Sequence, residues 1–153
     1  MKQVLLLSFL FFSFQLTARQ IEETTFSYWD KPDSQIYYSK PDSIDVNTKI
    51  IFIMHGSSRT AKKYLNDWLP LVKNRNVVLI APEFSKESYP EYVYLMMGTD
   101  RGKLLKDESL YLTDSLGLLF DFFTAKLKLS TTTFRLYGHS GGSQFVHRYL
   151  LLS

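Results

Sequence analysis

Three short apolar runs, separated by segments with helical spacing, constrain the fold of this chain more than any other feature. The runs cover residues 49–54, 76–82 and 132–137. Each run is continuously apolar rather than alternating, which is the pattern of a strand buried on both faces. Apolar residues recur at helical spacing in the intervening segments, near residues 60–69 and 112–127. Strands that alternate with helices in this way predict an α/β fold with a parallel sheet.

The segment before the first apolar run has a different pattern. Residues 24–29 and 35–39 are rich in strand-forming residues. Each is followed by a Lys-Pro-Asp-Ser sequence, at residues 31–34 and 40–43, which is typical of turns. We therefore expect antiparallel strands of one meander ahead of the parallel sheet.

The first 18 residues have the layout of a secretory signal peptide. Lys2 supplies a positive start, residues 4–16 are largely apolar, and the small residue Ala18 offers a cleavage point. A single membrane anchor is the less favoured alternative, because a spanning helix needs about 20 apolar residues. We expect a secreted or periplasmic protein without a stable membrane anchor, in which residues 19–153 fold as one domain.

Composition and charge exclude several classes of function. The chain has no cysteine, which excludes disulfides, thiolate metal sites and a lipid anchor through cysteine. Its formal net charge is only +3, and the basic residues are scattered, so nothing indicates binding to nucleic acid. No His-x-His, His-Glu-x-x-His or Asp-rich loop occurs, so we expect neither a metal nor another cofactor. The sequence leaves the oligomeric state open.

The third apolar run leads directly into Gly138-His139-Ser140-Gly141-Gly142, and a helical pattern follows. Gly-x-Ser-x-Gly between a strand and a helix predicts a nucleophile elbow, a tight turn that holds a serine out of the sheet. The flanking glycines are expected because a Cβ in such a turn would clash with its neighbours. Chance occurrence in a Gly/Ser loop is less favoured in this context. A nucleotide-binding loop is also less favoured, because no Gly-Lys-Ser/Thr and no Gly-x-Gly-x-x-Gly occurs.

The chain resembles the α/β-hydrolase family. The resemblance is carried by residues 50–58, a strand that ends in His-Gly, by residues 77–84, a strand that ends in Ala-Pro-Glu-Phe, and by residues 137–146, the elbow and its helix. More loosely, the chain is similar to secreted esterases and polyhydroxyalkanoate-depolymerase-like proteins, in which a helix with a tryptophan, here Trp68, follows the His-Gly loop. The resemblance spans about residues 35–153. It implies a mostly parallel sheet with flanking helices and an active site at the carboxyl ends of its strands.

The resemblance implies roles for individual residues. Ser140 would be the nucleophile, and its attack on an acyl carbon would create an oxyanion that needs aligned donors. The backbone N–H groups of Gly141 and Ser57 would be those donors, with Ser58 a weaker candidate. Gly56 would let the loop turn close to the substrate.

None of the three histidines is expected to be the catalytic base. His139 lies inside the elbow and should point away from Ser140, where it would support the turn. His55 flanks the loop that carries Ser57 and is expected to orient that loop. His147 follows Ser140 by seven residues on the same helix, which is about 10 Å along the axis and too far to accept its proton.

The long segment between the second strand and the second helix is polar and rich in tyrosine. Its glutamates could line a substrate mouth, although a solvated surface loop is favoured. Its tyrosines could equally bind an apolar or sugar-like substrate or pack in the core. These residues are Glu83, Glu87, Glu91, Tyr89, Tyr92 and Tyr94.

The acid and base of the family follow the nucleophile in the order Ser, Asp or Glu, His. No acidic residue follows Ser140, and His147 is the one later histidine. We therefore expect the N-terminal part of a longer hydrolase domain, truncated after the nucleophile helix and inactive alone. The complete enzyme would act on small-molecule or polymeric carboxylic esters. A serine peptidase of the same fold and an exported binding protein without catalysis are the alternatives.

Such a half-sheet would also have exposed apolar surface. The third parallel strand would lack its next neighbour, and the last helix would expose an apolar face near Phe145, Tyr149 and Leu152. Unpaired strand edges and large apolar patches favour association. Residues 19–153 expressed alone are therefore expected to aggregate or to form a loosely packed state.

Overall fold

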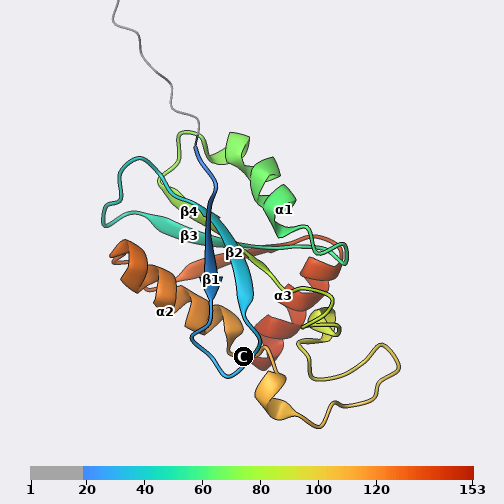
Figure 1. Ribbon diagram of the computed structural model, residues 1–153. Coiled ribbons are helices and arrows are strands. Elements are labelled where there is room, and N and C mark those ends of the chain that lie inside the picture. Colours follow the sequence, from blue (N-terminus) through green and yellow to red (C-terminus); the bar gives the residue numbers. More distant parts are fainter. Residues whose placement is uncertain (1–18) are drawn as a thin grey trace, which may run out of the picture.

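In the computed structural model, which describes residues 19–153, five strands form one twisted sheet (Figure 1). The spatial order is β1-β2-β4-β3-β5, with antiparallel pairing at β1–β2 and β2–β4 and parallel pairing at β4–β3 and β3–β5. The predicted α/β sheet with antiparallel N-terminal strands is therefore confirmed. The leader expected in residues 1–18 lies outside the described residues. The strands are β1 (Glu22–Phe26), β2 (Ser34–Ser39), β3 (Lys49–Met54), β4 (Val77–Glu83) and β5 (Phe134–Gly138).

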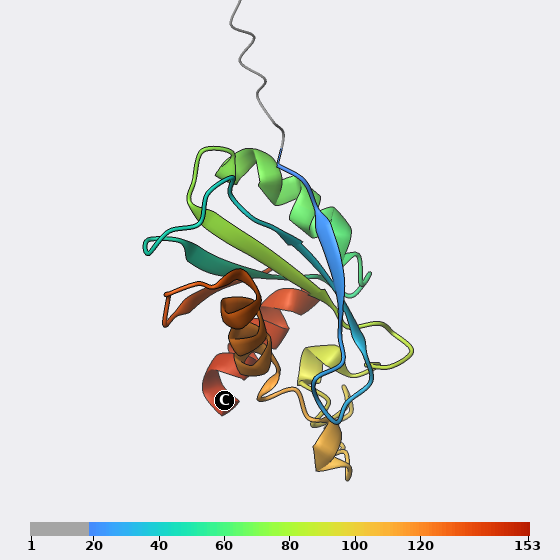
Figure 2. The same cartoon turned by 60° about the vertical axis from the view of Figure 1, so that its left-hand side comes forward.

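Helices cover both faces of the sheet. Helix α1 (Ala61–Trp68) lies on one face, and α2 (Ser115–Leu127) and α3 (Gly141–Leu152) lie on the other (Figure 2). Successive side chains of a strand point to opposite faces, so the continuous apolar sequence of β3 fills both layers. Phe52 joins the larger apolar cluster with α2 and α3, and Ile53 joins the smaller cluster with α1. No helix in residues 19–153 has the length and apolar character needed to cross a membrane.

The long connection between β4 and α2 contributes core residues. It contains two short 3₁₀ helices, η2 (Tyr92–Tyr94) and η3 (Glu108–Leu110). Tyr89 and Tyr92 are fully buried in the larger cluster, so these two tyrosines pack in the core. Tyr94 lies beneath the guanidinium of Arg148, 4.6 Å from its carbon. The connection is thus fastened to α3 by both apolar and cation–π contacts.

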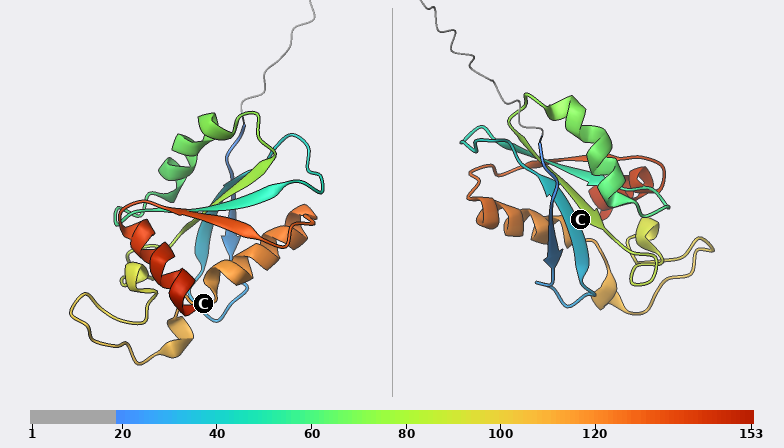
Figure 3. Two further views of the ribbon diagram at one scale, coloured as in Figure 1. Left: turned by 180° about the vertical axis from the view of Figure 1, so that it is seen from behind. Right: turned by 45° about the horizontal axis from the view of Figure 1, so that its top comes forward.

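Strand β5 is an edge strand, and the prediction that it is buried on both faces was wrong. Its residues alternate between half-buried and exposed. Phe134 and Leu136 pack against the larger cluster, whereas Arg135 and Tyr137 are exposed. In the described residues β5 pairs with β3 alone, so its outer edge is open at the side of the sheet seen in Figure 3.

The apolar face expected to be exposed on α3 is only partly exposed. Phe145 is fully buried and Tyr149 is nearly so, because both pack under the sheet in the larger cluster. Leu152 is exposed as expected, together with the two leucines before it. Leu150, Leu151 and Leu152 are 65%, 82% and 53% exposed.

Candidate active site

Ser140 occupies a strained turn between β5 and α3. Its backbone has φ 56° and ψ −122°, a conformation that costs about 1–3 kcal/mol for a residue other than glycine. The residues two positions before and after it must be glycine. A Cβ on Gly138 would lie 2.3 Å from the carbonyl oxygen of Gly142. A Cβ on Gly142 would lie 2.2 Å from the carbonyl oxygen of Met54. The turn therefore presents an exposed serine at the carboxyl edge of the sheet, against the end of β3.

The loop between β3 and α1 (residues 55–60), here called the oxyanion loop after the role expected of Ser57, lies directly beside this turn. A Cβ on Gly141 would be 2.8 Å from Oγ of Ser57 and 3.1 Å from its backbone nitrogen. A Cβ on Gly56 would be 3.6 Å from Cβ of Ser140. The two residues expected to donate N–H groups are thus adjacent, next to the serine. Gly141 also opens α3, where the helix dipole favours negative charge. Ser58 pairs instead with the hydroxyl of Thr60 at 3.2 Å.

His55 is fully buried at the base of the oxyanion loop. Its Nε2 accepts from the backbone N–H of Phe84 at 3.1 Å, so its Nδ1 carries the proton and donates to the carbonyl of Gly56 at 2.9 Å. Burial lowers its pKa from 6.5 to about 4, and the charge of nearby Arg59 acts in the same direction. The imidazole is therefore neutral near pH 7, and both ring nitrogens are already engaged. The position of His55 fits the role expected for it, which is to orient the oxyanion loop.

Arg59 joins the oxyanion loop to the segment after β4, a link that sequence reasoning missed. Its guanidinium donates to the carbonyls of Phe84 at 2.7 Å and Pro90 at 3.1 Å, and it lies 4.6 Å from the ring of Tyr92. Its own backbone is left-handed, with φ 61°. Nothing in the sequence marks this conformation, because it follows from contacts with residues about 30 positions away.

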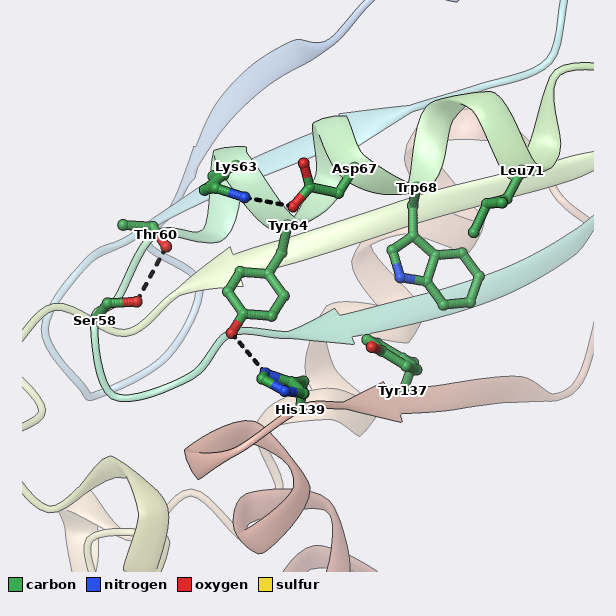
Figure 4. Close-up of a pocket in the computed structure, with 9 residues that line it drawn as sticks. All are labelled: Ser58, Thr60, Lys63, Tyr64, Asp67, Trp68, Leu71, Tyr137 and His139. Atoms are coloured by element: carbon green, nitrogen blue, oxygen red, sulfur yellow. Dashed lines mark hydrogen bonds and ion pairs between the residues drawn. The ribbon is translucent and has the colours of Figure 1, made fainter.

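His139 points from the elbow toward α1. Its Nδ1 lies 3.1 Å from the hydroxyl of Tyr64, which is the second residue that sequence reasoning missed (Figure 4). Both side chains line a pocket of about 480 Å³ between α1 and β5. The wall on the far side is aromatic, since the rings of Trp68 and Tyr137 meet edge to face at 4.8 Å. The remaining lining residues are Ser58, Thr60, Lys63, Asp67 and Leu71.

The other candidate groups lie apart from the elbow serine. His147 is exposed on α3, and Glu83 is half-buried at the end of β4, where burial raises the pKa of its carboxyl. In the described part of the chain the hydroxyl of Ser140 forms no hydrogen bond to a histidine or a carboxylate. Residues 19–153 likewise contain no group of three or more histidine or acidic side chains that could hold a metal ion.

The sheet order, the strained elbow and the adjacent loop define an α/β-hydrolase-type fold. A scan against models of protein families and a search of curated proteins both find no match. Among solved structures, a poly(aspartic acid) hydrolase from Sphingomonas sp. KT-1 is similar with a TM-score of 0.76 and 28% identity, over 85% of this chain and 50% of that one. A poly(3-hydroxybutyrate) depolymerase from Bordetella parapertussis is similar with a TM-score of 0.74 and 20% identity, over 88% and 47%.

A third similar structure is an acetyl xylan esterase from Aspergillus awamori, with a TM-score of 0.61 and 14% identity over 87% of this chain and 48% of that one. At such low identity the last two likenesses show the fold alone. The resemblance to α/β-hydrolase-type esterases and depolymerases is thereby confirmed. This chain spans about half the length of each of these structures.

Proposed function

We propose that this chain forms the nucleophile-bearing part of a secreted serine hydrolase that cleaves carboxylic esters through an acyl-enzyme on Ser140. The observation that carries the proposal is the strained backbone of Ser140, with φ 56° and ψ −122°, beside the adjacent residues Ser57 and Gly141. Residues held in such conformations cluster at active sites, where the strain is part of the mechanism. The similar structures add support, because they are named as hydrolases or depolymerases.

In the proposed reaction, Oγ of Ser140 attacks the ester carbonyl carbon while a base takes its proton. The N–H groups of Ser57 and Gly141 stabilise the resulting oxyanion. Collapse of this intermediate breaks the bond to the alkoxy group, which leaves as an alcohol after the protonated base returns the proton. Water then attacks the acyl-enzyme by the same steps in reverse order, which releases the carboxylic acid and restores the serine.

The base and its acidic partner are proposed to come from sequence that follows the nucleophile helix in a longer chain. Two observations support this part. His55 is neutral with both ring nitrogens engaged, and His139 is bound to Tyr64. The similar structures are about twice as long as this chain, and the fold places the acid and histidine after the serine.

Labelling with a fluorophosphonate tests the nucleophile. The protein expressed from its whole reading frame should gain one adduct, which peptide mass spectrometry should locate on Ser140. A Ser140→Ala variant should remain unlabelled and should retain its melting temperature. If the wild-type protein folds but carries no adduct on Ser140, the proposed mechanism is wrong and the alternative of a non-catalytic binding protein gains support.

An amide hydrolase is a second candidate. The similar structure with 28% identity is named a poly(aspartic acid) hydrolase, and poly(aspartic acid) is linked by amide bonds. An ester and an amide with the same acyl group distinguish the two candidates. The ester proposal expects turnover of the ester and none of the amide. Cleavage of the amide would favour the amide hydrolase, since an amide hydrolase also cleaves the more reactive ester.

Secretion is a separate part of the proposal and has its own test. The apolar stretch of the first 18 residues supports it. The mature protein isolated from the periplasm or the medium should begin at Arg19. A protein that retains Met1 and stays in the cytoplasm would contradict this part and leave the chemistry untouched.

A further inference from the structure

The two proposed oxyanion donors come from elements that are far apart in the sequence. Ser57 lies in the oxyanion loop after β3, and Gly141 begins α3. Donors stabilise a transition state only when they are already aimed at the position of the developing charge. Some contact must therefore hold the oxyanion loop and the elbow at a fixed separation.

Besides the backbone pairing of β3 with β5, which reaches Met54 and Gly138, one side-chain hydrogen bond connects the oxyanion loop and helix α1 with the elbow in residues 19–153. It joins the hydroxyl of Tyr64 to Nδ1 of His139 at 3.1 Å (Figure 4). The other close approaches between the two segments are van der Waals contacts, as at Gly141 with Ser57 and at Gly142 with the backbone carbonyl of His55. Contacts of that kind limit how near two segments come, whereas a hydrogen bond also limits how far apart they move.

The position of Tyr64 in α1 couples this hydrogen bond directly to the oxyanion loop. Tyr64 lies in the first turn of α1, immediately after the oxyanion loop. Ala61 in that turn and Leu65 directly after it are fully buried against the sheet. Its hydroxyl would be 2.9 Å from a Cβ on Gly56, so it fills the space between the loop and the elbow. Movement of this hydroxyl would therefore move the loop relative to Ser140.

We propose that Tyr64 is a positioning residue, whose hydrogen bond to His139 holds the oxyanion loop in register with Ser140. This inference rests on the proposed function of the same site. Tyr64 acts through the separation of Ser57 and Gly141 and does not touch the reacting atoms. The pair also gives His139 a role, since the residue before the nucleophile becomes the elbow's partner for α1.

The test uses Tyr64→Phe in the protein expressed from its whole reading frame. This change removes one oxygen and keeps the ring, so we expect kcat/KM to fall about tenfold through kcat, with KM unchanged. The inhibition constant of a boronic acid that mimics the tetrahedral intermediate should rise by the same factor. A merely structural role would lower the melting temperature without this parallel change.

Tyr137→Phe is the matched control. Tyr137 lines the same pocket and packs on Trp68, and its hydroxyl has no hydrogen bond within residues 19–153. Loss of this hydroxyl in Tyr137→Phe should leave kcat, KM and the inhibition constant of the boronic acid unchanged. Equal kinetic effects from Tyr64→Phe and Tyr137→Phe would overturn the inference.

Variants at His139 test the pair from its other side. Asparagine places a polar atom where Nδ1 stands, so His139→Asn should retain most activity, whereas His139→Leu should lose about as much as Tyr64→Phe. The double variant of Tyr64→Phe and His139→Leu should be no worse than either single variant, because both remove the same interaction. Additive losses would contradict a shared role.

The outcomes separate this inference from the proposed function. If wild-type protein is labelled at Ser140 and Tyr64→Phe retains wild-type kcat and boronate inhibition, the positioning role is wrong and the serine mechanism stands. If wild-type Ser140 is never labelled, the serine mechanism fails and the positioning role fails with it.

Discussion

Gly142 has the closest backbone approach among the glycines of the elbow. A Cβ there would lie 2.2 Å from the carbonyl oxygen of Met54 and 2.7 Å from that of His55. Both neighbours are backbone atoms of an interior strand and its adjoining loop, which cannot move aside without breaking the sheet. Gly142→Ala is expected to lower the free energy of unfolding by about 3 kcal/mol, measured by urea denaturation.

Gly117 provides the control for this prediction. It lies in α2, and its Cβ would meet only the hydroxyl of Tyr149 at an ordinary 4.0 Å. Gly117→Ala should therefore leave stability unchanged or raise it by about 0.5 kcal/mol through helix propensity. Similar losses at both positions would show that the close backbone approach at Gly142 is not the cause of its loss.

The buried imidazole of His55 makes stability depend on pH. Its pKa falls from 6.5 to about 4 on folding, so the unfolded chain binds this proton more readily than the folded chain. The contribution is fully present above pH 6.5 and is lost as the pH falls through that window toward 4. The whole effect is about 3 kcal/mol.

Urea denaturation at several pH values measures this effect. The loss of stability between pH 6.5 and pH 4 should be smaller in His55→Gln than in the wild type. His147→Gln removes an exposed histidine and should keep the wild-type dependence. An unchanged slope in His55→Gln would mean that His55 is not the buried proton acceptor.

At the scale of elements, the sequence predicted every described strand and all three α-helices near their observed positions. The signal was strong for β3 and β4 because their apolar runs fill both faces of the sheet. It was misread for β5, although Arg135 and Tyr137 alternate with Phe134 and Leu136 in the pattern of a half-exposed strand. The sheet order, with β4 between β2 and β3, depends on long-range pairing that no local pattern carries.

Helix α3 is held under the sheet by Phe145. Its ring stacks on Tyr92 at 4.9 Å and on Phe84 at 5.8 Å, which joins α3 to the segment after β4. Phe145→Ala should cost about 4 kcal/mol of unfolding free energy, because it empties a fully buried site between rings. Val146→Ala changes a half-buried neighbour and should lower the free energy of unfolding by only about 1 kcal/mol. Equal losses from Phe145→Ala and Val146→Ala would contradict this view of the packing.

At the scale of the whole molecule, the candidate site depends on contacts that cross long stretches of sequence. The elbow and the His-Gly loop could be predicted because each is a local motif between a strand and a helix. The links made by Tyr64 and Arg59 could not, since their partners are residues brought near only by the sheet order. The segment from β4 to α2 was likewise ambiguous, because tyrosine serves in a core as well as on a binding surface.

The open edge of the sheet is expected to cause residues 19–153 to associate when expressed alone. The unpaired edge of β5 lies beside an apolar groove of about 560 Å³, lined by residues of α2, β5 and α3 that include Phe120, Leu136 and Leu150. Leu151, the next residue of α3 after Leu150, is 82% exposed. A strand edge and apolar side chains in one region favour contact between chains. Light scattering should therefore give a mass above that of one chain.

Charged substitutions identify the surface responsible for this association. Leu150→Lys with Leu151→Lys should lower the measured mass, because two charges would have to be desolvated in any contact at this edge. Leu104→Lys changes an equally exposed leucine in the long connection, away from the sheet edge, and should leave the mass unchanged. If Leu104→Lys lowers the measured mass as much as the double change does, the association is non-specific and apolar. A wild-type segment that is monomeric and unfolds cooperatively would show that the edge of β5 is stable without a covering strand.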